Sequence, residues 1–150
     1  STSVGKIGIA DNGAAISNLF FSDDTILKDA IIKETALIKG AAMQLNEYLT
    51  GTRKLFDLPL APEGTAFQQT VWKALQAIPY GETKSYKETA ERINRPNASR
   101  AVGMANNRNP IVIVIPCHRV IGANGKLVGY AGGLNVKEKL LVIERQYASS

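Results

Sequence analysis

The chain has 150 residues, of which 45% are hydrophobic and 21% charged, and its mean hydropathy is −0.07. This composition is typical of one or two small globular domains, and it excludes a disordered chain or a membrane protein. No apolar run approaches the roughly 20 residues that a membrane helix requires. Residues 1–6 lack the basic and apolar stretches of a secretory signal, so we expect a cytoplasmic protein.

Positive charge is concentrated in the C-terminal part of the chain. Residues 1–62 carry 6 Lys and Arg against 7 Asp and Glu, whereas residues 63–150 carry 12 against 6. The net charge of +5 and the isoelectric point near 9.4 therefore arise from the second part alone. Such a surface suits a polyanion, although a basic domain with no nucleic-acid partner has the same composition.

The chain has one cysteine, Cys117, and one histidine, His118. A single cysteine excludes an internal disulfide and suits a reducing compartment. One cysteine and one histidine also exclude a classical zinc site with four such ligands, so we expect no metal. Because neither a GxxxxGK(S/T) nor a GxGxxG phosphate loop is present, we expect no nucleotide cofactor.

The first 62 residues have the pattern of a small α/β unit. Apolar runs at 4–10 and 14–21 flank Asn12 and Gly13, which predicts a β-hairpin. Apolar residues at helical spacing predict a helix over 34–49, with Gly51 as its stop. Residues 55–60 are interpreted as a further strand, and Pro59 and Pro62 indicate a domain boundary.

The second part begins with helices. Thr65 with Gln68 and Ser85 with Glu88 each have the spacing of a capping box, which predicts helices that begin at these two positions. Residues 95–97 suggest a turn with Asn97 as the N-cap of a helix over 98–106. Two short helices joined by a tight turn match a helix-turn-helix, with 98–106 as the recognition helix, although ordinary helical hairpins are commoner.

The remaining segments surround the cysteine. Residues 111–115 form a continuous β-branched run that predicts a buried strand, ending just before Pro116 and Cys117. A hairpin turn is expected at 123–126, and 130–133 is a glycine-rich segment that could approach a ligand closely. The last helix is expected over 135–145, with inward-facing apolar residues at Val136, Leu140 and Ile143.

Cys117 and His118 are the candidates for chemistry. Thiolate is the nucleophilic form of cysteine, and His118 could take the thiol proton directly or through a water if the turn folds both side chains inward. Glu144 is the candidate carboxylate that would orient His118. Taken singly, each has an ordinary alternative: a buried inert thiol, a hydrogen-bonded core histidine and a solvated helix residue.

Residues 115–120 (IPCHRV) resemble the acceptor-cysteine motif of the 6-O-alkylguanine-DNA alkyltransferases, also called methylated-DNA–protein-cysteine methyltransferases. Further segments similar to this family follow in the family's order: Phe67 with Val71 and Trp72, then 78–82 (IPYGE), 85–86 (SY), 99–103 (SRAVG), 109–110 (NP), 129–133 (GYAGG) and 137–141 (KEKLL). The resemblance is specific over about 63–146 and weak over 1–62.

The resemblance implies an α+β protein. A small N-terminal α/β domain of ribonuclease-H-like fold would span 1–62, and a mainly helical, winged helix-turn-helix domain with the active site would span 63–150. The implied function is DNA repair by irreversible, single-turnover transfer of an alkyl group from the 6-oxygen of guanine, with 4-O-alkylthymine as a further candidate substrate. No cofactor is implied. The partner would be double-stranded DNA, bound by a monomer through the minor groove with low sequence specificity, at the nucleoid or in a eukaryotic nucleus.

The resemblance also implies roles for individual residues. Cys117 would accept the alkyl group, His118 would help to deprotonate it through a water, and Glu144 would hold His118. Asn109 would fix the turn between the recognition helix and the active-site segment. Arg100 would enter the base stack in place of the damaged nucleotide, which must be flipped out of the duplex.

Other residues would form the substrate pocket and the DNA surface. Tyr86 would rotate the flanking phosphate and could donate to the departing purine. Many relatives have serine where this chain has Ala131, so a side-chain contact to the lesion is in doubt there, while the backbone N–H remains. The pocket would include Tyr86, Tyr130, Ala131 and Val128. The DNA surface would include Arg100, Tyr86, Ser85, Ala98, Ala101, Gly103 and Arg95.

Three other functions remain open from the sequence. A non-enzymatic lesion sensor would resemble this family but lack the acceptor cysteine. A cysteine hydrolase would show repeated turnover, and a winged-helix transcription factor would bind one sequence tightly without any covalent change.

Overall fold

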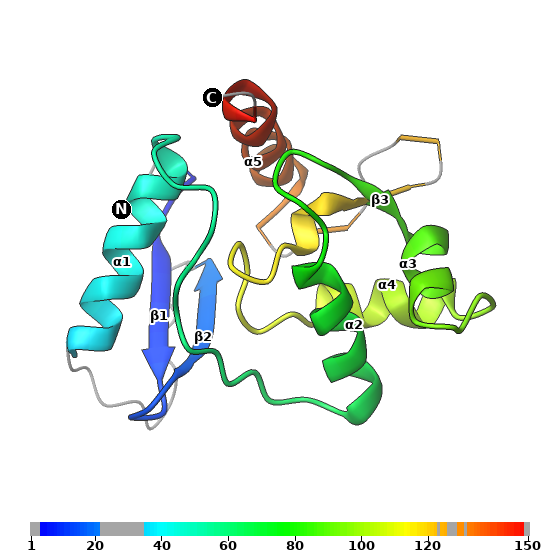
Figure 1. Ribbon diagram of the computed structural model, residues 1–150, viewed down its shortest axis with the longest axis horizontal. Helices are drawn as coiled ribbons and strands as arrows, with labels where there is room; N and C mark the ends of the chain where they lie inside the picture. The colour runs from blue at the N-terminus through cyan, green and yellow to red at the C-terminus, as the bar shows by residue number, and fades with distance from the viewer. Residues whose placement is uncertain (1–3, 22–34, 123, 126–128, 131, 149–150) are drawn as a thin grey trace.

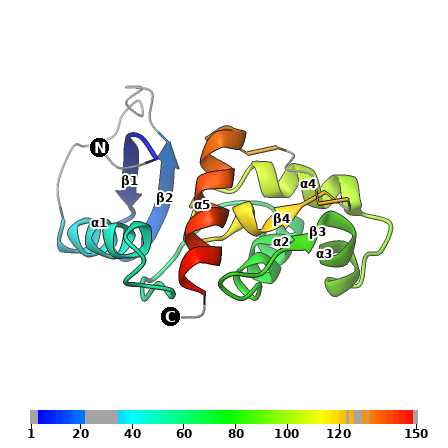
Figure 2. The ribbon, with the colours of Figure 1, turned by 90° about the horizontal axis from the view of Figure 1, so that it is seen from above.

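The computed structural model describes residues 4–21, 35–122, 124–125, 129–130 and 132–148. A hairpin and a helix from the N-terminal part lie on one side, and three helices from the C-terminal part lie on the other (Figure 1). The final helix, α5 (Leu134–Tyr147), lies between these two groups when the molecule is viewed from above (Figure 2). Within the described part of the chain, no helix has the length and apolar character needed to cross a membrane.

The predicted N-terminal hairpin is confirmed. Strands β1 (Ile7–Asp11) and β2 (Ile16–Phe21) pair antiparallel. The side-chain oxygen of Asn12 accepts hydrogen bonds from the backbone N–H groups of Ala14 and Ala15, both at 2.9 Å. These bonds satisfy the turn locally, as expected for an asparagine in this position.

The predicted first helix is also confirmed, as α1 (Ala36–Leu49). Thr35 caps it by accepting from the N–H of Ile38, and its hydroxyl donates to Asp11 at 2.7 Å, which ties the helix to β1. Gly51 follows the helix with a φ of +83°, a conformation that glycine adopts without strain.

The strand predicted at 55–60 is wrong. This segment makes one isolated bridge, in which the N–H of Ile16 donates to Pro59 and the N–H of Ala61 donates to Ile16, both at 2.8 Å. Pro59 and Pro62 have no N–H to donate, so a longer ladder cannot form around this bridge.

Three helices form the first half of the C-terminal part: α2 (Ala66–Gln76), α3 (Tyr86–Arg92) and α4 (Ser99–Asn107). Both predicted capping boxes are present, at Thr65 and Ser85. The predicted N-cap at Asn97 is wrong. Ala98 occupies that position, and its methyl group cannot cap the helix; its own N–H donates to the carbonyl of Arg95.

Helices α2, α3 and α4 pack against one another, and the indole of Trp72 fixes this arrangement. Its Nε1–H donates to the carbonyl of Ala105 at 2.9 Å, which links α2 to α4 in the core. Asn94 has a φ of +61° in the turn between α3 and α4, a conformation that asparagine tolerates better than most residues. The chain thus forms the expected helix pair joined by a tight turn.

The last elements complete the C-terminal part. Strand β3 (Lys84–Ser85) pairs parallel with β4 (Val120–Ile121). Helix α5 confirms the predicted last helix and extends it at both ends, but its face is partly polar: Leu140 is buried as predicted, together with Lys137 and Glu144. The turn predicted at 123–126 includes residues outside the described ones. Within it, the N–H of Gly125 donates to the carbonyl of Gly122.

The buried strand predicted at 111–115 is wrong, although the segment is buried. The N–H of Val114 donates to Val112 across Ile113, whose φ is +73°, so the chain makes a tight γ-turn there. Such a φ strains a β-branched residue, and the surrounding contacts must offset that strain. Strand β2 supplies two of them: the N–H of Leu19 donates to Pro110, and Leu19 accepts from Val112.

We expect Thr65→Ala to destabilise the protein by about 1 kcal/mol, because an N-cap hydroxyl satisfies an otherwise unpaired helix N–H. Here Thr65 Oγ1 accepts from Gln68 at 3.1 Å, and the site is exposed, so the substitution leaves no cavity. Urea unfolding should show a lower midpoint at unchanged slope. Thr65→Ser keeps the hydroxyl and should behave nearly as the unmodified protein. Equal stability of the alanine and serine variants would show that the cap contributes nothing.

Candidate active site

Cys117 lies at the start of a short 3-10 helix, η1 (Cys117–Arg119), in the interior of the protein. Pro116 directs the chain into it through an inverse γ-turn, in which the N–H of Cys117 donates to Ile115 at 2.8 Å. The three side chains of η1 are all buried, with relative exposures of 3%, 0% and 8% for Cys117, His118 and Arg119. Both candidate residues therefore point inward, as the chemistry requires.

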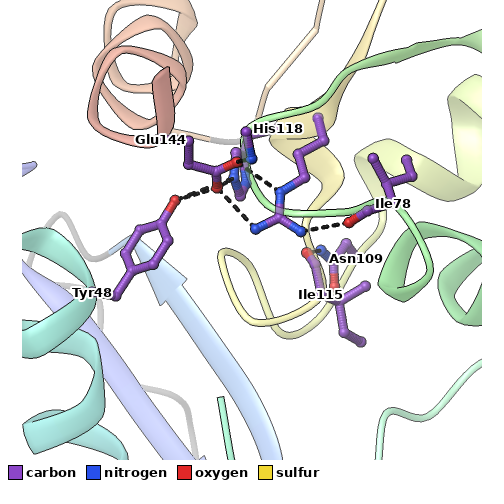
Figure 3. A network of polar contacts seen from close by, with 8 residues as sticks. Tyr48, Ile78, Asn109, Ile115, His118 and Glu144 are labelled. Atoms are coloured by element: carbon purple, nitrogen blue, oxygen red, sulfur yellow. Dashed lines mark hydrogen bonds and ion pairs between the residues drawn. The ribbon is translucent and has the colours of Figure 1, made fainter. Parts of the chain in front are cut away.

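Asn109 closes the loop that leads to the cysteine. Its Nδ2 donates to the carbonyl of Ile115 at 2.7 Å, and its Oδ1 accepts from the N–H of Ile111 at 2.9 Å (Figure 3). Burial raises the pKa of the Cys117 thiol to about 11, and a hydrogen bond from Asn109 and the charge of Lys137 limit this rise. The resting thiol is therefore protonated at neutral pH and requires a base.

The carboxylate of Glu144 is the centre of the polar network (Figure 3). Its Oε2 accepts from His118 Nε2 and the Tyr48 hydroxyl, both at 2.6 Å, and from Arg119 Nη2 at 3.0 Å. Its Oε1 accepts from Arg119 Nε at 2.8 Å and from the N–H of Gly81 at 3.1 Å. Burial alone would raise the pKa of Glu144, but the hydrogen bonds from His118 and Arg119 and the positive charge of Arg119 outweigh it and lower the pKa to about 2.

These contacts assign the tautomer of His118. An ionised carboxylate only accepts, so the short contact to Glu144 places a hydrogen on Nε2. Burial lowers the pKa of His118 despite the attraction of Glu144, and Arg119 and Lys137 add to the lowering, so the ring is neutral. Nδ1 then carries a lone pair, and among the described residues no group hydrogen-bonds it. The imidazole is thus prepared to accept a proton.

Two tyrosines lie close enough to feel the charge of a Cys117 thiolate. Burial raises the pKa of both Tyr86 and Tyr130, and a charge on Cys117 raises each further. The Tyr130 hydroxyl is buried with no partner among the described residues, and its ring packs edge-on against Phe21 at 5.6 Å. Two further predicted pocket residues, Val128 and Ala131, lie outside the described residues.

The predicted DNA-contact residues lie on α3, α4 and the turn between them. Arg100 and Ala101 are exposed on α4, and Gly103 faces the ring of Tyr86. The hydroxyl of Ser85 is engaged in capping α3, where it accepts from Glu88.

The last two DNA-contact residues lie near the start of α4. Ala98 precedes its first residue, and Arg95 places its guanidinium 5.9 Å from the ring centre of Phe67.

Sequence reasoning missed three residues of this site. Arg119 was missed although it lies in the motif itself. It hydrogen-bonds Glu144 and also donates to the carbonyl of Ile78 at 2.7 Å. Tyr48 comes from α1, in the part of the chain where the resemblance is weak. Lys137 is fully buried, and its Nζ donates to Val120 at 2.6 Å. Its place in the segment 137–141 was the only signal for it.

No metal site is formed by the residues described. Among them, no three His, Cys, Asp or Glu side chains cluster in a way that could hold a metal ion. Instead, the geometry places the only thiol beside a His–Glu pair, close to a helix-turn-helix pair. This combination defines a class of proteins that bring a cysteine nucleophile to a nucleic acid.

Comparison with protein families identifies the chain more closely. Residues 66–146 match the 6-O-methylguanine DNA methyltransferase, DNA binding domain, and residues 1–62 match the 6-O-methylguanine DNA methyltransferase, ribonuclease-like domain. A methylated-DNA–protein-cysteine methyltransferase of Methanosarcina acetivorans is 59% identical over 77% of this chain and 74% of its own length. The Mycobacterium bovis protein of the same name is 48% identical over 97% and 89%.

A solved structure agrees over almost the whole length. The crystal structure of Mycobacterium tuberculosis OGT in complex with DNA superposes with a TM-score of 0.91 at 47% identity, covering 98% of this chain and 91% of that one. The chain therefore belongs to the 6-O-methylguanine DNA methyltransferase family. The α+β fold class expected from the sequence, with a ribonuclease-like first part and a DNA-binding second part, is confirmed.

We expect Glu144→Gln to destabilise the protein by about 3 kcal/mol or more, because it removes the negative charge that balances buried Arg119. The matched control is Glu138→Gln, an exposed position on the same helix, which should change stability by less than about 0.5 kcal/mol. Urea unfolding of both variants at neutral pH measures the difference. Similar midpoints for the two would contradict the central place of this carboxylate.

Proposed function

We propose that this protein repairs DNA by transferring a methyl or larger alkyl group from the 6-oxygen of guanine irreversibly to Cys117. The observation that carries the proposal is that the only cysteine of the chain is buried in η1 next to a neutral imidazole, which an ionised carboxylate holds. Relatives named methylated-DNA–protein-cysteine methyltransferase support the reaction type. 4-O-Alkylthymine remains a further candidate substrate.

The proposed reaction begins with the thiol proton. It passes from Cys117 Sγ to Nδ1 of His118 through a water, and Glu144 stabilises the imidazolium that forms. The thiolate then displaces guanine from the alkyl carbon in line, so that an S–C bond forms as the O–C bond breaks. The departing purine takes a proton from the Tyr86 or the Tyr130 hydroxyl, and the proton on the His118 imidazolium then returns to that phenolate through water, so that one proton passes overall from the thiol to guanine.

The product explains why the reaction would occur only once. A thioether is not hydrolysed by water at neutral pH, and the described residues contain no second thiol to remove the group. Each protein molecule would therefore repair one lesion. We propose that Asn109 supports this step by fixing the loop before Cys117, and that Ala131 and Val128 complete the pocket.

The alkylated oxygen lies inside the duplex, so the base must be flipped out before Cys117 can reach it. The DNA complex of the Mycobacterium tuberculosis relative supports DNA as the partner. We propose that α4 enters the minor groove, since Ala98, Ala101 and Gly103 place small residues at the start and middle of this helix, and that Arg100 fills the vacated space. Ser85, Tyr86 and Arg95 would contact the flanking backbone.

The remaining proposals concern organisation. The boundary between the two parts would lie at 62/63, consistent with the basic charge of the second part, which suits phosphate contacts of low sequence specificity. The protein would act as a monomer, because one chain holds every residue of the proposed reaction. Its substrate, chromosomal DNA, would place it inside the cell.

Incubation with a duplex containing 6-O-methylguanine should add the mass of one methylene to each chain, on the peptide that contains Cys117. Intact-mass and peptide-mapping spectra measure this, and Cys117→Ser should remain unmodified, since a hydroxyl is a far weaker nucleophile. Repeated turnover with unmodified protein would instead favour a hydrolase. Binding to the duplex with no transfer would favour a lesion sensor or a transcription factor.

Arg100→Ala should slow repair of duplex DNA by about tenfold or more, because unstacking the base costs a few kcal/mol that the guanidinium partly offsets. Reaction with the free base 6-O-benzylguanine should be unchanged, since no stack is involved. Arg145→Ala removes the same charge from an exposed position on α5 and controls for net charge. Equal losses on free base and duplex would exclude a role in the stack.

A further inference from the structure

One member of the polar network comes from the N-terminal part of the chain. Tyr48, near the end of α1, is fully buried. Its hydroxyl donates to Oε2 of Glu144, which lies 96 positions later in the chain, at 2.6 Å. The same hydroxyl oxygen lies 3.3 Å from His118 Nε2. Figure 3 shows the ring extending from α1 towards the carboxylate, on the side opposite Asn109.

The hydroxyl of Tyr48 has one hydrogen to donate, and the short distance to Glu144 shows that the carboxylate accepts it. Burial raises the pKa of Tyr48 well above its usual range, and the neighbouring carboxylate raises it further, so the hydroxyl remains a donor. Its oxygen can then present only lone pairs to His118 Nε2, which is compatible with a hydrogen on that nitrogen and incompatible with a lone pair there. Tyr48 thus favours the tautomer whose free lone pair is on Nδ1.

We propose that Tyr48 is a positioning residue for alkyl transfer, through which the N-terminal part of the chain holds Glu144 in place and sets how strongly that carboxylate attracts a proton to His118. This inference rests on the proposed transfer to Cys117. It adds a contribution from α1 to a site whose other side chains come from residues 86–144.

The charged groups around His118 determine the sign of the effect. Glu144 and Lys137 face it from α5, Arg119 follows it in η1, and Tyr48 approaches from α1. A donor to Glu144 disperses its negative charge and so weakens its pull on an imidazolium. Removing the hydroxyl should therefore raise the pKa of His118. Loss of the tyrosine lone pair acts in the opposite direction, but that contact is longer, 3.3 Å against 2.6 Å, and therefore weaker.

Tyr48→Phe removes the hydroxyl and keeps the ring that packs on Phe56, with ring centres 5.4 Å apart. The matched control is Tyr80→Phe. Tyr80 lies beside Tyr48 with ring centres 6.1 Å apart, and its buried hydroxyl has no hydrogen-bond partner among the described residues. The two variants lose the same atom in nearly the same place, but only one loses a bond to Glu144.

Because His118 is the only histidine, nitrogen-15 NMR of the imidazole reports its tautomer and its pKa without ambiguity. We expect the hydrogen on Nε2 in the unmodified protein and in Tyr80→Phe. In Tyr48→Phe we expect a pKa raised by at least half a unit, with the hydrogen still on Nε2 because the 2.6 Å contact to Glu144 remains. An unchanged pKa of His118 in Tyr48→Phe would overturn the proposal.

The rate of reaction with free 6-O-benzylguanine, measured against pH, gives the second readout. For Tyr48→Phe we expect a second-order rate constant about tenfold lower, the effect of one hydrogen bond to a charged group, and an acidic limb moved to higher pH. The final extent should remain one alkyl group per folded chain. A lower final extent at an unchanged rate constant would show that Tyr48 only supports folding, and would also overturn the proposal.

A 3-fluorotyrosine at position 48 covers the case in which phenylalanine prevents folding. It keeps the hydroxyl but makes it a stronger donor, so the pKa of His118 should fall and not rise. No shift, or a shift upwards, would count against the inference. The NMR measurements do not depend on alkyl transfer, so failure of the unmodified protein to react would refute the proposed function and leave the Tyr48 result to be judged separately.

Discussion

The buried carboxylate of Glu144 is the constraint on which the rest of the site depends. A charge with 1% exposure costs several kcal/mol unless close donors surround it, and here five hydrogen bonds from four residues do so. The donors come from α1, from the loop after α2 and from η1. Because a shift of any one of these segments would leave the charge incompletely paired, the carboxylate fixes their relative positions, and with them the orientation of the imidazole.

The same constraint joins the two parts of the chain. Tyr48 enters the network from α1, and β2 hydrogen-bonds through Leu19 to the strained loop around Ile113. The local backbone preference of a β-branched residue such as Ile113 disfavours a positive φ. Contacts from β2 and Asn109 must therefore maintain this loop conformation. The N-terminal part therefore contacts the chain on both sides of Cys117. It supports the γ-turn that precedes the cysteine, and it supports the Glu144–His118 pair that follows it.

Structural features that depend on interactions within a few residues were predictable from the sequence, and features that depend on contacts between distant residues were not. The turn at Asn12 and the capping boxes at Thr65 and Ser85 are satisfied locally, so their patterns sufficed. The run at 111–115 has the composition of a strand, but tertiary contacts fold it into turns, because β-propensity mainly reflects burial. The sequence pointed to Cys117 and His118 as its only cysteine and histidine and to Glu144 as the candidate carboxylate, and the motif resemblance implied their roles. No local sequence pattern indicated that Tyr48 belongs to the site, because a tyrosine on an amphipathic helix is commonly half-buried with its hydroxyl in water.

The depth of Cys117 has a consequence for a protein that reacts once. Because burial raises the pKa of the Cys117 thiol to about 11, very little of it is ionised at pH 7, so oxidants and stray alkylating agents find little thiolate to attack. A resting site of this kind conserves the single reaction that each chain can perform. Reactivity must then appear when the substrate is in place, and in the proposed reaction the neutral His118 supplies it, because its Nδ1 takes the thiol proton before the S–C bond forms. Low resting nucleophilicity and a prepared base are thus complementary, and both follow from burying the thiol beside an imidazole whose partner, Glu144, is held ionised.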